Sequence, residues 1–292
     1  MTNYVDILTY RIVPKKINPT AKGNKVVYGP IISKRSYHSL GINLWPYGKV
    51  CNFDCIYCCC GKSSKSNNLV MPLEQIKQEI RSGLEFHLKN NSFIQDILVE
   101  GNGEPTLHPH FSEITDYVIE LRNQYFPNIP LVLFTNSTNL KEKIVIDSIL
   151  KYDQAFFKLD CINDNTLKKV NGFNGSIKTL VDNLKEVGNL INTKKHNLKN
   201  FEISTAVVNS PEGNICDLYS DMFSKIIIEL NPQKIYFYDI DRVVPNSEQT
   251  YKTTFEKMKK LGKHIFKNTN IETIVLSSKV GRGMHELAKL ND

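Results

Sequence analysis

Mainly apolar runs of six to eight residues recur along the chain and alternate with longer amphipathic stretches. Six such runs occur, at residues 39–44, 96–101, 131–136, 155–160, 201–208 and 234–240. Runs in which apolar residues are not interleaved with polar ones are typical of strands that are buried on both faces. We therefore expect six inner strands of a parallel sheet with both faces covered.

The stretches between these runs carry apolar residues at the spacing of an α-helix. In residues 71–90 they recur every three or four positions, and the apolar face consists of Leu73, Ile76, Ile80, Leu84 and Leu88. Further helices are expected at 111–124, 140–151, 176–192 and 214–229. Strands that alternate with helices predict an α/β fold with right-handed crossovers. A full barrel, a partial barrel and a doubly wound sheet all satisfy this pattern.

The alternating pattern places a single core at residues 38–245. Residues 1–37 form a short N-terminal extension. Residues 246–292 form a C-terminal extension that we expect to pack on the core, with a basic amphipathic helix followed by a strand at 271–276. No internal repeat or low-complexity linker interrupts the sequence, so it predicts one main domain.

Composition and charge narrow the setting in which the protein works. The chain has 292 residues, of which 41% are hydrophobic and 23% are charged, as in ordinary globular proteins. Its apolar runs are too short to cross a bilayer, and its first residues lack the basic-then-apolar order of a secretory signal. We therefore expect a cytoplasmic protein without a membrane partner. The net charge of +7 permits a polyanionic partner such as tRNA without requiring one.

Five of the seven cysteines lie within residues 51–60. Because a reducing compartment disfavours disulfides, clustered cysteines of a cytoplasmic protein are more often metal ligands or redox groups. Cys51, Cys55 and Cys58 have the spacing C-x3-C-x2-C. This spacing leaves open an iron–sulfur cluster, a zinc site and a C-x-x-C redox pair. A zinc site would need a fourth ligand, for which the sequence offers His38, His108 and His110.

Chemically reactive or polar residues cluster directly after the predicted strands. The cysteines follow the first strand, and the stretch GNGEPT (101–106) follows the second. Asn136 follows the third strand, Asp160 the fourth and Arg242 the sixth. The carboxyl ends of parallel strands meet at one edge, and α/β proteins bind their ligands there. We therefore expect a single site with the cysteines at its rim.

The three-cysteine spacing, Tyr57 just before the third cysteine, and the GNGEPT stretch one strand later resemble the radical S-adenosylmethionine (radical SAM) superfamily. The resemblance implies a partial (β/α)6 barrel, which agrees with the six expected strands. It also implies that Cys51, Cys55 and Cys58 hold a [4Fe–4S] cluster whose fourth iron binds S-adenosyl-L-methionine. The implied activity is reductive cleavage of S-adenosylmethionine to a 5′-deoxyadenosyl radical that abstracts a hydrogen atom from a substrate.

The resemblance assigns cofactor contacts to residues at the strand ends. Gly101, Gly103 and Glu104 are expected to receive the methionyl amino group, and Tyr57 to lie near the adenine. The remaining candidates, for the ribose hydroxyls or the carboxylate, are Asn136, Lys158 and Asp160. Structural roles remain open for all of them, because glycines form turns, aromatic residues pack and polar residues end strands.

Candidate catalytic residues are Cys161, which follows Asp160, and Arg242, which follows the sixth strand. Lys34 and Arg35 resemble a basic turn of the family and could contact an anionic group, or form a solvated loop. Cys59 and Cys60 exceed what a three-cysteine cluster needs, and their role stays open between radical chemistry and incidental small residues. Cys216 lies in an expected helix, where we expect it to be buried.

A narrower resemblance concerns four stretches: 28–58, 99–111, 156–172 and 235–250. They are similar to iron–sulfur oxidoreductases grouped with the wyosine-tRNA (4-demethylwyosine) synthases. This implies a tRNA nucleoside or related nucleotide as substrate, with a ribosomally made peptide or a small metabolite as the alternative. Wyosine synthesis itself is not expected, because those enzymes carry second-cluster cysteines upstream and no cysteine precedes Cys51 here.

Two further expectations concern the partners of the protein. A radical SAM enzyme needs an electron donor such as flavodoxin or ferredoxin. The remaining alternative to an enzyme is a binding module stabilised by zinc, which would contain no sulfide.

Overall fold

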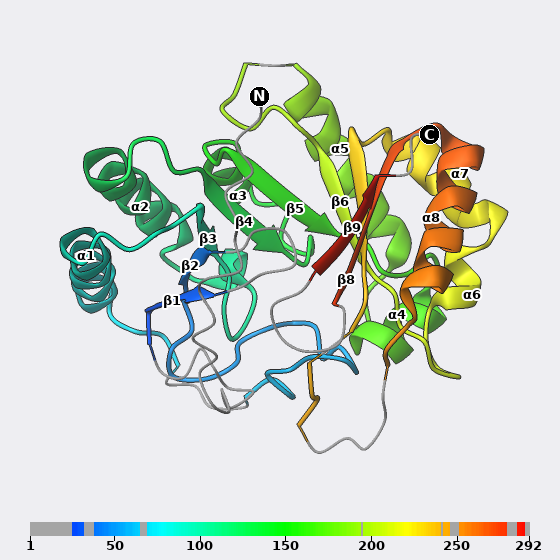
Figure 1. The fold of residues 1–292 in the computed structure, drawn as a ribbon, viewed down its shortest axis with the longest axis horizontal. Coiled ribbons are helices and arrows are strands. Elements are labelled where there is room, and N and C mark those ends of the chain that lie inside the picture. Colours follow the sequence, from blue (N-terminus) through cyan, green and yellow to red (C-terminus); the bar gives the residue numbers. More distant parts are fainter. Residues whose placement is uncertain are drawn as a thin grey trace, which may run out of the picture.

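The computed structural model of the chain describes residues 25–31, 38–64, 69–193, 195–240, 242–245, 251–278 and 285–289. The described strands form one nine-stranded sheet in which every strand pairs with its neighbour along the chain (Figure 1). The strands are β1 (Val27–Ile31), β2 (Ser39–Ile42), β3 (Asp96–Val99), β4 (Leu131–Thr135), β5 (Gln154–Lys158), β6 (Glu202–Ala206), β7 (Lys234–Tyr238), β8 (Glu272–Ser278) and β9 (His285–Lys289).

Strands β2 to β8 are parallel, and β1 and β9 are antiparallel edge strands. The order runs from β1 to β9 without closing among the described strands, so the sheet is a partial barrel. The prediction of an α/β partial barrel is confirmed, and its six strands are β2 to β7. The strand expected in the tail is β8, which adds a seventh parallel strand to the barrel. The sequence did not predict β1 and β9, since β1 contains Gly29–Pro30 and β9 is short and largely polar.

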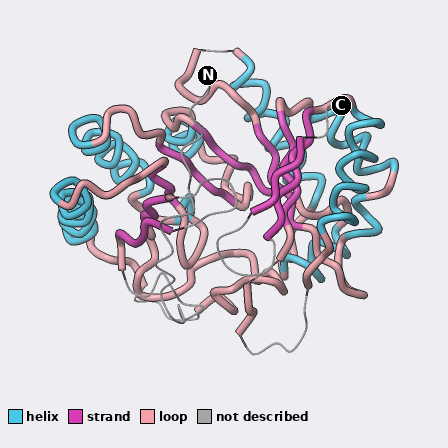
Figure 2. The backbone as a smooth tube through the Cα atoms, viewed as in Figure 1, coloured by secondary structure: helices cyan, strands magenta, loops and turns pink. Residues whose placement is uncertain are grey.

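Helices join the parallel strands and cover the outside of the sheet. They are α1 (Leu73–Lys89), α2 (Phe111–Tyr125), α3 (Lys143–Ile149), α4 (Asp164–Asn171), α5 (Ile177–Asn192), α6 (Ile215–Leu218), α7 (Asp221–Leu230) and α8 (Phe255–Thr269), with a 3₁₀ turn η2 (Pro105–Leu107) after β3. Figure 2 shows these helices outside the strands, at the two sides of the barrel.

Two helices differ from the sequence prediction. The helix expected at 214–229 is divided into α6 and α7, because the Ser220 hydroxyl accepts the Phe223 amide and so begins a new helix. Cys216 on the one-turn α6 is exposed, so the prediction that it is buried was wrong. The short α4 was not predicted, although Asn163 caps its beginning and Gly172 ends it in the left-handed conformation with φ 63°.

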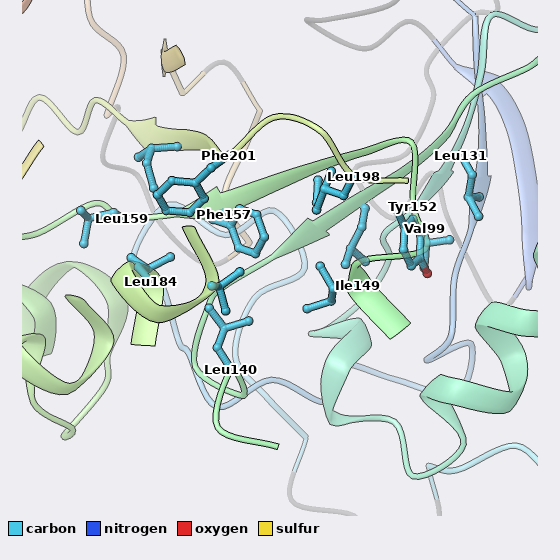
Figure 3. Packing of buried hydrophobic residues seen from close by; sticks show 14 of the residues in the cluster. Val99, Leu131, Leu140, Ile149, Tyr152, Phe157, Leu159, Leu184, Leu198 and Phe201 are labelled. Carbon is cyan, nitrogen blue, oxygen red and sulfur yellow. The ribbon is translucent and has the colours of Figure 1, made fainter. Parts of the chain in front are cut away.

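The strands are apolar throughout because their two faces pack against different layers. Outward-facing Val99, Leu131 and Phe157 lie in a large cluster with helix residues such as Ile149 and Leu184 (Figure 3). The inward-facing side chains form a second cluster inside the barrel, made of Leu98, Val132, Phe156, Tyr236, Ile274 and Leu276. This arrangement agrees with the expectation that both faces of the sheet are covered.

Both predicted extensions contribute strands to the same sheet. The N-terminal one supplies β1, and the C-terminal one supplies α8, β8 and β9. The boundaries of the core at residues 38 and 245 stay a prediction. Within the described ranges, none of the helices combines the length and apolar character that crossing a bilayer requires.

The loop after β2 runs beneath the carboxyl ends of β3, β4 and β5, along the lower side of Figure 1. The Val50 carbonyl accepts the Glu104 amide at 2.9 Å, Asn136 Nδ2 donates to Asn52 Oδ1 at 2.7 Å, and the Asp54 amide donates to the Asn171 carbonyl at 2.7 Å. The loops that follow four strands therefore meet at one edge of the sheet, as the sequence predicts.

Candidate functional site

The centre of this edge is the cysteine loop, residues 49–64, which is closed by polar contacts of its own. Lys49 Nζ lies 3.1 Å from Asp54 Oδ1 and donates to the Gly61 carbonyl at 2.6 Å. Asp54 Oδ1 also accepts the Ser63 amide at 2.7 Å, and the Ser63 hydroxyl donates to the Cys51 carbonyl at 2.6 Å. These bonds tie the two ends of the loop together around the cysteines.

Each of the three spaced cysteines receives a hydrogen bond at its sulfur. Asn136 Nδ2 lies 3.5 Å from Cys51 Sγ, which also accepts the Phe53 amide at 3.4 Å. Asn171 Nδ2 donates to Cys55 Sγ at 3.3 Å. The Cys58 sulfur is hydrogen-bonded by Cys60. Donors from the end of β4, from α4 and from the loop itself thus converge on the three sulfurs.

The three thiols differ in acidity. Burial raises the pKa of Cys51 to about 12 and the pKa of Cys55 to about 11. The hydrogen bond from Cys60, with help from the charge of Lys49, lowers the pKa of Cys58 to about 6 against the effect of burial. Two of the three thiols therefore keep their protons at neutral pH until a positively charged group such as iron displaces them.

The donor set fits an iron–sulfur cluster better than a zinc ion. A zinc ion needs four ligands at about 2.3 Å from one centre, whereas a cluster distributes its thiolates over several irons. In the part of the chain that the structure describes, no three His, Cys, Asp or Glu side chains are arranged to hold one metal ion. Nor is His108 aimed at the cysteines, since it packs on Trp45 and its Nδ1 accepts the His110 amide at 3.2 Å.

The carboxylate of Glu104 is buried, with 3% of the residue exposed, and it is used inside the protein. Oε1 accepts from the Thr106 amide at 3.1 Å, the Thr106 hydroxyl at 2.7 Å and the Thr135 hydroxyl at 2.8 Å, and Oε2 accepts from the Asn136 amide at 2.6 Å. Burial raises the pKa of Glu104, although these hydrogen bonds oppose the shift. Glu104 thereby joins the turn after β3 to the end of β4.

Gly101 and Gly103 allow this turn to approach the neighbouring loops. A Cβ on Gly101 would lie 2.1 Å from Asn43 Oδ1, and one on Gly103 would lie 1.9 Å from the Val50 carbonyl oxygen. The Trp45 indole also donates to the Glu104 carbonyl at 2.8 Å. The two glycines are thus required by packing against the protein itself, apart from any contact with a cofactor.

Asp160 organises a buried polar group beside the cysteine loop. The Tyr57 hydroxyl donates to Asp160 Oδ2, and the same oxygen accepts from Asn171 Nδ2 at 2.9 Å and lies 3.2 Å from Lys158 Nζ. Lys158 Nζ donates to the Tyr238 hydroxyl at 2.5 Å, and it lies 5.2 and 5.1 Å from the ring centroids of Tyr57 and Tyr238. The group links β5 and β7 to the cysteine loop.

The charges of this group are fixed by their surroundings. Burial alone would lower the pKa of Lys158, but the Asp160 carboxylate and the Tyr238 hydroxyl outweigh it and raise that pKa. Burial, reinforced by the Asp160 charge, raises the pKa of Tyr57 well above its usual value. Lys158 is therefore a cation and Tyr57 a neutral hydroxyl at physiological pH.

The two candidate catalytic residues lie in contrasting places. Cys161 is fully buried, and its thiol donates to Asn171 Oδ1 at 3.2 Å, while burial raises its pKa. Arg242 is exposed, and its Nη1 lies 3.7 Å from Cys59 Sγ at the rim of the cysteine loop. Lys34 and Arg35 lie outside the described residues.

The structure therefore gathers the candidates from the cysteines to Asp160 at one edge, and it adds two residues that the sequence did not single out. Lys49 stands two positions before the first cysteine, and this position was its only signal. Asn171 ends α4, a helix whose capping residues Asn163 and Gly172 were visible in the sequence.

The family comparison agrees with this geometry. The family described as "Radical SAM superfamily" matches residues 45–198, more than half of the chain, and this range includes the cysteine loop. The chain belongs to the radical SAM superfamily, so the family prediction is confirmed. Membership implies an iron–sulfur cluster, S-adenosylmethionine and an external reductant.

Similar solved structures include TYW1 with a lysine–pyruvate adduct bound, with a TM-score of 0.57 and 14% identity over 87% of this chain and 80% of that one. Streptococcus suis SuiB bound to its precursor peptide SuiA gives a TM-score of 0.56 and 12% identity over 82% of this chain and 48% of that one. These likenesses concern the fold.

Sequence relatives include a UPF0026 protein of Helicobacter pylori, which is 30% identical over 151 residues, or 50% of this chain and 46% of that protein. A Brachyspira hyodysenteriae protein named GTPase Obg is 28% identical over 253 residues, or 87% of this chain and 35% of that protein. The matched regions thus amount to less than half the length of these two relatives.

Proposed function

We propose that this protein is a radical SAM enzyme that holds a [4Fe–4S] cluster on Cys51, Cys55 and Cys58. The observation that carries the proposal is the set of three thiols in one loop, each with a hydrogen-bond donor at its sulfur. Hydrogen bonds of this kind are a usual means of stabilising cluster thiolates. Since only three cysteines have this spacing, one iron stays available for S-adenosylmethionine.

Cys51, Cys55 and Cys58 would hold the cluster, and the bound cluster would supply the electron for reductive cleavage of S-adenosylmethionine to methionine and a 5′-deoxyadenosyl radical, the species that would abstract a substrate hydrogen atom. The protein excludes water around it. Phe53, Tyr57 and Val170 form an apolar cluster against which Cys51 and Cys55 pack. Such a dry wall protects a radical from side reactions.

We propose that the turn Gly101–Glu104 binds the methionyl amino group, and that backbone carbonyls of this turn, rather than the Glu104 carboxylate, accept its hydrogen bonds. The reason is that the Glu104 oxygens already accept four hydrogen bonds from the protein. Glu104 then acts by positioning the turn. We assign Asn136 to the support of Cys51 rather than to the ribose, because its Nδ2 is directed at that sulfur and at Asn52.

On the other side of the loop, we assign Tyr57 to the wall of the adenine site and Lys158 to an anionic group of S-adenosylmethionine. Lys158 is a cation held between two aromatic rings, and 17% of its side chain is exposed. Asp160 has no exposed side-chain surface and holds Tyr57 and Lys158 in place. Cys161, being buried, acts through Asn171, and Arg242 stays a candidate for substrate contact.

We propose that the substrate is a nucleoside in tRNA. We also propose that a flavodoxin or ferredoxin supplies the electron. The net charge of +7 and the fold likeness to TYW1 over 87% of the chain support this choice. A ribosomally made peptide is the second candidate, supported by the fold likeness to SuiB bound to its precursor peptide.

The chemistry is tested by anaerobic reconstitution with iron and sulfide, followed by reduction in the presence of S-adenosylmethionine. We expect iron and sulfide in the protein and release of 5′-deoxyadenosine. A Cys55→Ala variant should lose both, whereas Cys216→Ala, which alters an exposed cysteine on α6, should keep both. Zinc without sulfide in the wild-type protein would refute the proposal.

The substrate is tested by comparing modified tRNA nucleosides of a deletion strain with those of its parent. We expect one modified nucleoside to disappear, and to return when the wild-type gene is supplied but not when Cys55→Ala is supplied. An unchanged nucleoside profile would reject tRNA and favour a peptide or a metabolite.

A further inference from the structure

The amino group of Lys49 lies inside the cysteine loop. Only 5% of its side chain is exposed, and it bridges Asp54 Oδ1 at 3.1 Å and the Gly61 carbonyl at 2.6 Å. Burying a lysine charge is costly unless charged or polar groups compensate it. Burial of the Lys49 ammonium group is therefore energetically unfavourable, and a function of its charge would explain why a lysine occupies this position.

The two charges of the Lys49–Asp54 ion pair differ in their exposure to water. Asp54 faces outward, with 39% of its side chain exposed, so that water screens its charge, and it also accepts the Ser63 amide. Lys49 faces inward, where its charge acts on the sulfurs of Cys58 and Cys51. The positive charge of Lys49 is therefore screened by water much less than the negative charge of Asp54 that balances it.

Loop closure alone would not require a cation. A neutral hydrogen-bond donor could reach the Gly61 carbonyl, and the Asp54 carboxylate is already held by the Ser63 amide. Closure of the cysteine loop therefore does not explain why the side chain at position 49 carries a buried positive charge.

We propose, building on the proposed cluster, that Lys49 is a positioning residue with an electrostatic effect on electron uptake. Its two hydrogen bonds, to Asp54 and to the Gly61 carbonyl, hold together the two ends of the loop that carries Cys51 and Cys58. Its charge favours the reduced cluster, which carries one more negative charge than the oxidised cluster. Positive charge near a cluster is one of the means by which proteins raise its reduction potential.

The test is a redox titration of the reconstituted protein, followed by electron paramagnetic resonance of the reduced cluster. Lys49→Met removes the charge and the donor, Lys49→Gln keeps an amide donor, and Lys49→Arg keeps the charge. In Lys49→Met and Lys49→Gln we expect the ratio of reduced to oxidised cluster at the wild-type midpoint to fall about tenfold, which for one electron equals a shift of about −59 mV. Lys49→Arg should stay near the wild-type potential.

Asp54→Asn serves as the control of opposite sign. It keeps an oxygen that accepts the Ser63 amide but removes the negative charge, so the potential should rise, by less because Asp54 is exposed. A merely structural role of Lys49 would not produce opposite shifts at the two positions.

The outcomes separate this inference from the proposed function. A wild-type protein that binds no iron and sulfide would refute the proposed function. If the wild-type cluster forms and Lys49→Gln titrates at the same potential, the inference on Lys49 is wrong and the cluster stands. If Lys49→Met loses iron while Lys49→Gln retains it, the positioning effect is supported, and the potential of Lys49→Gln decides the electrostatic one.

Discussion

Asn171 donates its side-chain amide to the sulfur of Cys55 at 3.3 Å, although 116 positions separate the two residues in the chain. The same amide group donates to Asp160 at 2.9 Å, and its oxygen accepts from Cys161 at 3.2 Å. One buried side chain thus connects the cysteine loop, the end of β5 and α4. It fixes Cys55 relative to the barrel.

Replacing Asn171 should weaken the cluster site. Asn171→Leu removes the donor to Cys55 and leaves the buried Asp160 short of one partner, so iron affinity should fall by about 10- to 100-fold, as for other residues that support metal ligands. Iron content after competition with a chelator measures this. Asn197→Ala, which changes an exposed asparagine, is the control, and equal iron retention in both variants would contradict the role of Asn171.

Breaking the ion pair of Lys158 and Asp160 should destabilise the protein. Asp160→Ala leaves the Lys158 cation in a mainly buried site and should lower the free energy of unfolding by about 3–5 kcal/mol. Lys158→Met in the same background should restore part of this loss, since it removes the unpaired charge. Urea unfolding of the four proteins of this cycle measures the coupling, and strictly additive losses would argue against it.

Glu104 should be needed for folding of the site rather than only for binding. Glu104→Ala deprives the Thr106 and Asn136 amides of their acceptor and should cost about 1–3 kcal/mol for each buried group left unpaired. Glu104→Gln keeps an acceptor oxygen and should be milder. Unfolding transitions compare the two, with Glu113→Ala on α2 as an exposed control. A fully stable Glu104→Ala protein would show that these hydrogen bonds contribute little.

Thiol labelling of the cluster-free protein should depend on pH differently at each cysteine. The pKa of Cys58 is lowered to about 6, chiefly by the hydrogen bond from Cys60, so its thiolate should react with iodoacetamide at pH 7 and lose reactivity below pH 6. Burial raises the pKa of Cys51 to about 12, so its labelling should be slow until strongly alkaline pH. Mass spectrometry of peptides at several pH values reads this out, and identical profiles would contradict the assignment.

Much of the fold could be predicted because it depends on local patterns. The parallel strands are apolar on both faces, and this pattern is visible without knowledge of neighbours. The two edge strands were harder to recognise, because β9 is short and largely polar and because the Gly29–Pro30 pair in β1 is typical of a turn. The short α4 has too few turns to show a helical period, although its caps are recognisable.

The cysteine spacing predicted where the site lies, but the partners of each side chain depend on contacts between distant loops. Nothing near Asn171 in the sequence indicates that α4 lies against Cys55. Similarly, the Gly-Glu turn could be located, whereas the saturation of Glu104 by Thr106, Thr135 and Asn136 follows only from the meeting of β3 and β4. Sequence motifs therefore locate residues, and tertiary contacts determine what those residues are free to do.

The most direct test of the central claim is the release of 5′-deoxyadenosine by the anaerobically reconstituted, reduced protein supplied with S-adenosylmethionine. We predict 5′-deoxyadenosine from the wild-type protein, together with bound iron and sulfide, and none above background from Cys55→Ala. Equal amounts from both proteins, or none from a wild-type protein that carries its cluster, would contradict the account.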